Sequence, residues 1–196
     1  MIYFKDQLKD KYSSYRNVNA KVKHEVDAGR LIRLKKGVYT DSPNEDPFLC
    51  ANALIRPSYI SFYSALSYHG LIPERVYEIM SAVCLLNKNK KFGSSGHRFS
   101  FYNIPKEIFS FGVDLTSGGF SIASAEKALA DTLYFLAPVH SITSLNELLF
   151  EDLRVDEYSF GLLNKDELIR ILPLYKSTNT TLLMKLLEEK DGKRSN

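Results

Sequence analysis

The stretch NVNAKVKHEVDAGRLIRLKKGVYT, residues 17–40, decides the fold expected for the N-terminal part of the chain. Valines recur at every fourth residue from Val18 to Val26 and therefore line one stripe of a helix. Asn17 can cap the first turn, because its side-chain oxygen can accept from an unpaired backbone N–H. Gly29 follows the last valine, where a residue with a positive φ commonly ends a helix. The pattern predicts a helix between Asn17 and Gly29.

A short basic hairpin is predicted directly after this helix. Residues 31–34 and 38–40 are the expected strands, and Lys35-Lys36-Gly37 is the turn between them. Gly37 supplies the positive φ that a tight turn tends to need. A helix with a polar, cationic outer face, joined to a basic hairpin, is typical of a winged helix-turn-helix. In that module the helix enters the DNA major groove and the hairpin contacts the neighbouring phosphate backbone.

The residues before Asn17 are predicted to complete this unit. Residues 2–10 are expected to form a short first helix with Leu8 facing inward, and residues 11–16 to form the turn, or a vestigial second helix, before the valine helix. An amphipathic helix followed by a hairpin also occurs in domains that bind no nucleic acid, so DNA binding is at this point a hypothesis.

The positive charge of the chain is concentrated at its N-terminus. The 196 residues carry a formal net charge of +3. Residues 1–40 hold ten lysines and arginines against four acids, a net charge of +6, so that residues 41–196 carry −3. A basic N-terminal region on a mildly acidic remainder indicates a polyanionic partner for that region.

Ten residues of this region are candidate contacts to DNA. The set comprises Arg16, Asn17, Asn19, Lys21, Lys23, His24, Arg30, Arg33, Lys35 and Lys36. Those expected to approach the bases from the helix are Asn19, Lys23 and His24. Those expected to bind backbone phosphates are Arg16, Lys21, Arg33, Lys35 and Lys36.

A proline-containing polar segment, DSPNEDP at 41–47, separates this region from the rest of the chain. It predicts a domain boundary between Thr40 and Asp46. The expected domains are a winged helix-turn-helix at 1–42 and an α+β domain at 46–190, followed by a disordered tail at 191–196. The fold class is therefore α+β, with a winged helix-turn-helix before a mixed α/β domain that has a small antiparallel sheet and a helical C-terminus.

The second domain is predicted to contain a pair of antiparallel strands. Residues 76–86 and 97–104 are rich in strand-forming residues, and the exposed basic loop 87–96 would join them. The lysines of this loop, Lys88, Lys90 and Lys91, are candidates for a second phosphate contact. Gly93-Ser-Ser-Gly96 lacks the remainder of a phosphate-binding loop and is interpreted as a hairpin tip.

The C-terminal part of the sequence is dominated by helical patterns. Ser124 is predicted to cap a strong helix that Pro138 stops. Lys127 and Asp131 lie one turn apart on this helix and can pair for a few tenths of a kcal/mol. A last helix is expected to end near Lys190.

Several classes of function lack support in the sequence. Cys50 and Cys84 are isolated, which argues against a disulfide framework and a structural zinc site, and the four histidines lack metal-ligand spacing. No catalytic motif supports an enzyme, and no cofactor is expected. Because the N-terminus has no apolar signal region and no run is long enough to span a membrane, the expected location is the cytoplasm.

Three blocks of the sequence together resemble a known family. They are RLIRLKKGVYT at 30–40, PSYISFYSALSYHGLIPE at 57–74 and SIASAEKALADTLYF at 121–135. Their order and spacing resemble AbiEi-type antitoxins, the transcriptional-regulator halves of type IV toxin–antitoxin, or abortive-infection, systems. The resemblance covers most of residues 17–137 and is more specific than any one block.

The resemblance implies two linked activities. The N-terminal winged helix would repress the protein's own operon by binding repeats in the promoter. The C-terminal domain would neutralise a cognate nucleotidyltransferase-like toxin, often without a lasting complex. The expected partners are therefore duplex DNA from the promoter and that toxin, with no membrane partner.

Two other functions stay open. In one, the chain is a protein-binding module that neutralises the toxin by direct contact, and its winged helix is degenerate. In the other, the chain is an enzyme that acts on the toxin or on a nucleic acid. Binding to upstream DNA in a gel shift separates an autorepressor from a pure protein-binding module.

Overall fold

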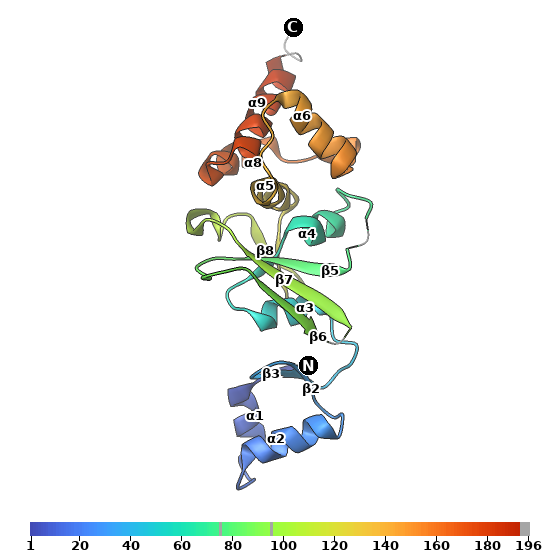
Figure 1. Ribbon diagram of the computed structural model, residues 1–196, viewed down its shortest axis with the longest axis vertical. Helices are drawn as coiled ribbons and strands as arrows, with labels where there is room; N and C mark the ends of the chain where they lie inside the picture. Colours follow the sequence, from blue (N-terminus) through green and yellow to red (C-terminus); the bar gives the residue numbers. More distant parts are fainter. Residues whose placement is uncertain (75, 95, 193–196) are drawn as a thin grey trace.

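The computed structural model describes residues 1–74, 76–94 and 96–192 and arranges them in three tiers (Figure 1). The N-terminal residues 1–40, here called the head, form one end. A six-stranded sheet lies in the middle, and C-terminal helices form the other end. Residues 46–192, within the described ranges, are called the body. The molecule has mixed α+β architecture with one sheet in each part.

The head contains two helices and a three-stranded antiparallel sheet. Its elements are β1 (Ile2–Phe4), α1 (Lys5–Lys11), α2 (Val18–Asp27), β2 (Ile32–Lys35) and β3 (Val38–Thr40). The strand order is β1-β3-β2, so that the first strand of the chain pairs with the last strand of the hairpin.

The predicted helix and hairpin at residues 17–40 are confirmed. The Asn17 side chain accepts from the backbone N–H of Ala20 at 3.0 Å and so caps α2. Gly29 and Gly37 have φ of 70° and 87°, the left-handed values expected at the helix end and in the hairpin turn.

The predicted first helix at residues 2–10 is wrong in its first half. Residues Ile2–Phe4 form β1 and pair with β3, which satisfies their backbone groups across the sheet instead of along a helix. Helix α1 therefore begins at Lys5, and Leu8 is buried as expected, with 1% of its surface exposed.

The body is built on a mixed six-stranded sheet, where the sequence predicted only a small antiparallel one. Its order is β6-β7-β5-β4-β9-β8. The strands are β4 (Tyr59–Ile60), β5 (Glu78–Val83), β6 (Lys90–Ser94), β7 (His97–Asn103), β8 (Val113–Leu115) and β9 (Ser121–Ala123). Helix α3 (Pro47–Leu54) lies on the side of the sheet toward the head, and α4 (Phe62–Tyr68) lies on the other side (Figure 1).

The predicted antiparallel pairing of residues 76–86 with 97–104 is wrong. β5 and β7 are parallel, with Ile79 opposite Phe99. The segment predicted as a loop contains β6, which pairs antiparallel with β7 and makes the chain cross over before β7 returns beside β5. Of the predicted hairpin tip, Ser95 lies outside the described residues.

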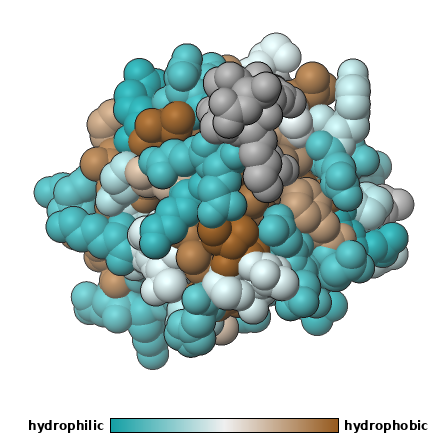
Figure 2. All heavy atoms as spheres, turned by 90° about the horizontal axis from the view of Figure 1, so that it is seen from above, coloured by the Kyte–Doolittle hydropathy of each residue, from teal (hydrophilic) through white to brown (hydrophobic). Residues whose placement is uncertain are grey.

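Helices follow the sheet to the end of the described chain. They are α5 (Ala125–Phe135), α6 (Ile142–Asn146), the π-helical η2 (Glu147–Asp152), α7 (Glu157–Gly161), α8 (Lys165–Ile171), the short 3-10 turn η3 (Leu172–Tyr175) and α9 (Thr178–Gly192). Another 3-10 turn, η1 (Lys106–Ile108), lies earlier, between β7 and β8. α9 continues two residues beyond its expected end, and the rest of the predicted tail, residues 193–196, lies outside the described residues. Seen from this end, hydrophilic residues surround a smaller hydrophobic area (Figure 2).

The head and the body share a hydrophobic core. Leu34 and Val38 of the head hairpin belong to the same buried cluster as Cys50 and Leu54 of α3. A second, much smaller cluster of Leu8, Val22 and Leu31 lies inside the head. The hairpin therefore contributes to the core of the body. The division into domains at 1–42 and 46–190 stays a prediction.

A fully buried polar network ties α5 to the sheet and to the C-terminal helices. The predicted ion pair between Lys127 and Asp131 forms, with 2.7 Å between Nζ and Oδ1, but both side chains are completely buried. The Tyr175 hydroxyl lies 2.6 Å from each of these two groups. Tyr59 and Ser61 donate to the second carboxylate oxygen at 3.0 and 2.6 Å. Burial lowers the pKa of Lys127, and Asp131 partly offsets that effect.

This network predicts a large cost for removing its carboxylate. Asp131→Ala leaves the Lys127 ammonium buried without its counter-ion and should lower the free energy of unfolding by about 3–5 kcal/mol. Urea denaturation followed by circular dichroism measures the loss. Asp114→Ala, at an exposed position of β8, is the control and should change stability by less than about 0.5 kcal/mol. Equal stability of the two variants would show that the buried carboxylate contributes little.

Candidate nucleic-acid interface

A groove of about 450 Å³ opens on the head between its helices and its hairpin. Its floor is apolar and consists of Leu8, Val18, Val22, Val26 and Tyr39. Its rim is cationic and carries Lys5, Lys9, Lys23, Arg33 and Lys36, against a single acid, Asp27. A concave surface with five positive charges and one negative charge has an electrostatic potential that attracts anions.

Four of the predicted DNA-binding residues meet at this groove. Asn19 and Lys23 lie one turn apart on α2, whereas Arg33 and Lys36 come from β2 and the hairpin turn. All four are exposed. The charges that the sequence placed in one region are therefore gathered on one surface by residues from two different elements.

The cations of α2 and of the hairpin that line the groove are available to a ligand. Among the described residues, no carboxylate lies within ion-pair distance of Lys23, Arg33 or Lys36. Lys9, by contrast, pairs with Asp6 at 2.8 Å on the surface of α1. Unpaired ammonium and guanidinium groups can bind phosphate oxygens without first breaking an internal ion pair.

Two lysines of the rim were missed from the sequence. Lys5 and Lys9 lie four residues apart, so they occupy one face of α1. That spacing was a usable signal. The two lysines were missed because the expected helix began three residues earlier, and only its inward-facing residues were considered.

Two other predicted contacts, Lys21 and Arg30, are occupied inside the head. Glu25, which is 6% exposed, accepts from Lys21 Nζ at 2.6 Å. It also accepts from Arg30 Nε and Nη2 at 2.6 and 3.0 Å. Hydrogen bonds from Arg30 and Lys21 lower the pKa of Glu25 to about 2. These three side chains join α2 to the residues that precede β2.

Lys35 points toward the body. Its ammonium donates to the carbonyl of Leu54 at the end of α3, and its side chain is half-buried. Burial, followed by the charge of Lys90, lowers the pKa of Lys35. The structure therefore places this lysine as a link between hairpin and body, on the side away from the groove.

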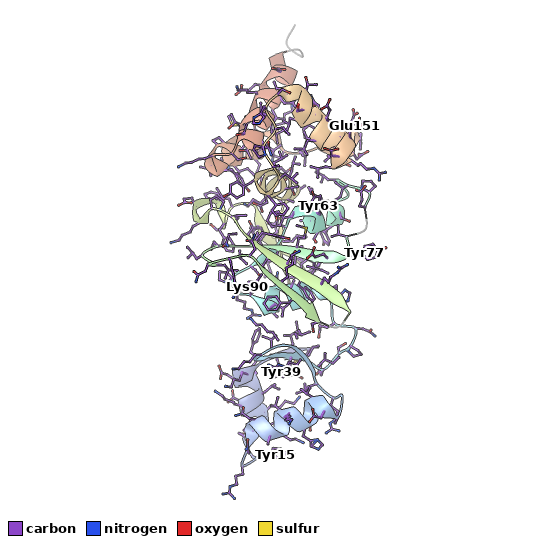
Figure 3. The ribbon with its side chains drawn as sticks, viewed as in Figure 1. Tyr15, Tyr39, Tyr63, Tyr77, Lys90 and Glu151 are labelled. Carbon is purple, nitrogen blue, oxygen red and sulfur yellow. The ribbon has the colours of Figure 1, made fainter. Side chains whose placement is uncertain are left out.

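The remaining predicted residues lie at the two ends of α2, Arg16 and Asn17 at its start and His24 in its last turn. Arg16 is exposed in the turn beside Tyr15, which Figure 3 labels at the far end of the head. Asn17 uses its side-chain oxygen as the helix cap. His24 is exposed on α2 but does not line the groove. Arg16 and His24 therefore remain accessible to a ligand larger than the groove itself.

Comparisons with models of known protein families and with curated proteins found no match. The resemblance to AbiEi-type antitoxins therefore rests on the three sequence blocks. Within the described ranges, no three His, Cys, Asp or Glu side chains converge on a point where a metal ion could bind. None of the described helices combines the length and hydrophobicity that crossing a membrane requires.

The Glu25 network predicts a pH-dependent contribution to stability. The pKa of Glu25 in the folded protein, about 2, lies below its ordinary value of 4.5. Its contribution is therefore fully present above about pH 4.5 and is lost as the pH falls toward 2. Glu25→Gln should be less stable than the unsubstituted protein at pH 7, and the difference should shrink between about pH 4.5 and 2.

Urea midpoints measured from pH 7 to pH 2 test this expectation. Glu107→Gln, at an exposed position of η1, is the control and should follow the unsubstituted protein throughout. A gap between Glu25→Gln and the unsubstituted protein that stays constant down to pH 2 contradicts the assignment.

Proposed function

We propose that the chain is a DNA-binding protein whose head binds a duplex as a winged helix-turn-helix. In this proposal α2 enters the major groove, and the turn between β2 and β3 lies against the neighbouring phosphate backbone. Two features support it. Helices α1 and α2 lie in sequence between the first strand and the hairpin, and β3 pairs with both other strands of the head.

The observation that carries the proposal is the meeting of Asn19 and Lys23 of α2 with Arg33 and Lys36 of the hairpin on one groove. A phosphate backbone that passes between a major-groove helix and a wing would run along such a groove. In this arrangement Lys23, Arg33 and Lys36 bind phosphates, and Asn19 and His24 lie toward the bases. Lys23 is thus moved from the bases, where the sequence pattern predicted it, to the phosphates, because it shares the groove with Arg33 and Lys36. Lys21, Arg30 and Lys35 have structural roles.

The number of cations at the groove sets how strongly DNA binding depends on salt. If Lys5 joins the three unpaired cations, four phosphates are neutralised, and the logarithm of the binding constant should fall with the logarithm of salt with a slope of about −3.6. Affinity would then drop about 150-fold between about 50 and 200 mM salt. The measured slope therefore counts the phosphates that the protein neutralises when it binds.

The biological role that we propose follows the resemblance to AbiEi-type antitoxins. The chain would repress its own operon through the head and neutralise a nucleotidyltransferase-like toxin through the body, without enzymatic activity of its own. A head and a body with different surfaces support two separate activities. The basic groove lies on the head, at the opposite end of the molecule from α9 (Figure 1).

A second candidate function is toxin neutralisation by direct contact. It is favoured by a groove of about 530 Å³ on the body, lined by Tyr63, Tyr77, Tyr102 and Phe135 among others. Tyr77 is 77% exposed, and Figure 3 labels Tyr63 and Tyr77 on the same side of the body. Exposed aromatic side chains in a groove are common at protein interfaces. Co-purification of the chain with the product of the neighbouring reading frame tests this alternative.

The DNA-binding proposal predicts a strong effect of reversing charge at the groove. Lys23→Glu combined with Lys36→Glu should weaken binding to the duplex upstream of the reading frame at least 100-fold, because two phosphate contacts become repulsive. A gel shift at about 100 mM salt measures the change. Lys106→Glu combined with Lys185→Glu, on η1 and α9, makes the same change in net charge away from the head and should bind normally. Equal loss in both double variants contradicts a specific role for the groove.

The same head variant should separate the two proposed activities. Because Lys23 and Lys36 lie on the head, their reversal should abolish repression of a promoter reporter and leave neutralisation intact. Co-expression with the neighbouring toxin gene, scored by growth, measures neutralisation. A folded variant that fails in both assays would assign neutralisation to the head.

A further inference from the structure

Strand β6 of the body runs beside strand β2 of the head. Near one end, the Ser94 hydroxyl donates to the backbone carbonyl of Arg33 at 3.4 Å. Lys90, the first residue of β6, lies close enough to Lys35 that its charge lowers the pKa of that lysine. The start of β6 is thus next to the hairpin turn, although the two are more than 50 residues apart in sequence.

The register of the sheet places Lys90 on the side that faces the head. Lys90 lies opposite Phe101, so the two side chains share a face of the sheet. Tyr102 is on the other face, where it packs against Phe62 of α4 and Phe135 of α5. The face that carries Phe101 and Lys90 is therefore turned away from α4 and α5, toward α3 and the head. Figure 3 labels Lys90 at this lower side of the sheet.

The neighbouring lysine has the opposite placement. Lys91 points to the other face and pairs with Glu78 at 3.3 Å. Among the described residues no carboxylate pairs with Lys90, which is exposed. Lys90 instead lies near another cation, Lys35 of the hairpin. Like charges held close together without an acid repel each other, and an anion bound between them removes that repulsion.

We propose that Lys90 binds a backbone phosphate of the same DNA duplex that occupies the head groove, so that the interface crosses from the head onto the body. This inference rests on the proposed function of the head. Lys36, exposed in the hairpin turn, lines the groove and directly follows Lys35, the lysine that lies near Lys90. Of the two lysines of β6, Lys90 and Lys91, the face on which each lies thereby selects Lys90.

Salt dependence of binding tests this role. The full-length chain is titrated against a fluorescent duplex from the DNA upstream of its reading frame, at salt concentrations from about 50 to 200 mM. Lys90→Ala should reduce the slope of log affinity against log salt by about 0.9, the value for one lost phosphate contact. The unsubstituted protein should therefore weaken about 3.5-fold more than the variant over that range.

Lys91→Ala is the matched control, because it removes the same charge one residue away on the opposite face. It should keep the slope of the unsubstituted protein. A slope for Lys90→Ala equal to that of Lys91→Ala overturns the inference, and so does weaker binding without a change of slope. If Lys23→Glu combined with Lys36→Glu loses binding while Lys90→Ala is silent, the head proposal stands and only the extension to the body fails. If neither changes binding, both fail.

Discussion

The packing of the β2–β3 hairpin between two different environments is the constraint on which the rest of this structure depends. Leu34 and Val38 are 5% and 3% exposed and belong to the core of the body, whereas Arg33 and Tyr39 line the groove on the other side. Alternation along a strand produces this division, because successive side chains point to opposite faces. One short hairpin therefore attaches the head to the body and presents charge to the outside.

A single irregularity in this hairpin decides the role of Lys35. Arg33 lies opposite Tyr39, but Lys35 lies opposite Val38, so the register shifts by one residue between them. A shift of one residue moves a side chain to the other face of the sheet. Lys35 consequently shares the face of Val38 and reaches the carbonyl of Leu54. Of these two neighbouring lysines of the hairpin, Lys36 is the one that lines the groove.

Local sequence signals were sufficient for the parts of the head that depend on neighbours in the chain. The cap by Asn17 and the turn at Gly37 are set within a few residues, and the prediction at both places is confirmed. The placement of β5 beside β7 depends on a crossover through β6, which leaves no local pattern. The complete burial of Lys127 with Asp131 was also invisible, because an i, i+4 pair has the same spacing on a surface and in a core. The Lys35 shift and the Glu25 network escaped prediction for the same reason: both depend on contacts that only the folded chain brings together.

Fewer positive charges are available at the groove than the ten lysines and arginines of residues 1–40 indicate. Those that line the groove are gathered on one surface. Glu25 takes up Lys21 and Arg30, and the Leu54 carbonyl takes up Lys35, so three of the ten cations in residues 1–40 serve the fold. Those that remain at the groove are held by elements whose inner faces are buried, which limits the entropy lost when a ligand orders them. Because these cations are already held in place, a small number of them can bind a phosphate backbone. Because the hairpin also belongs to the body's core, the groove and the start of β6 are held in one fixed relation, as a continuous binding surface for a duplex requires.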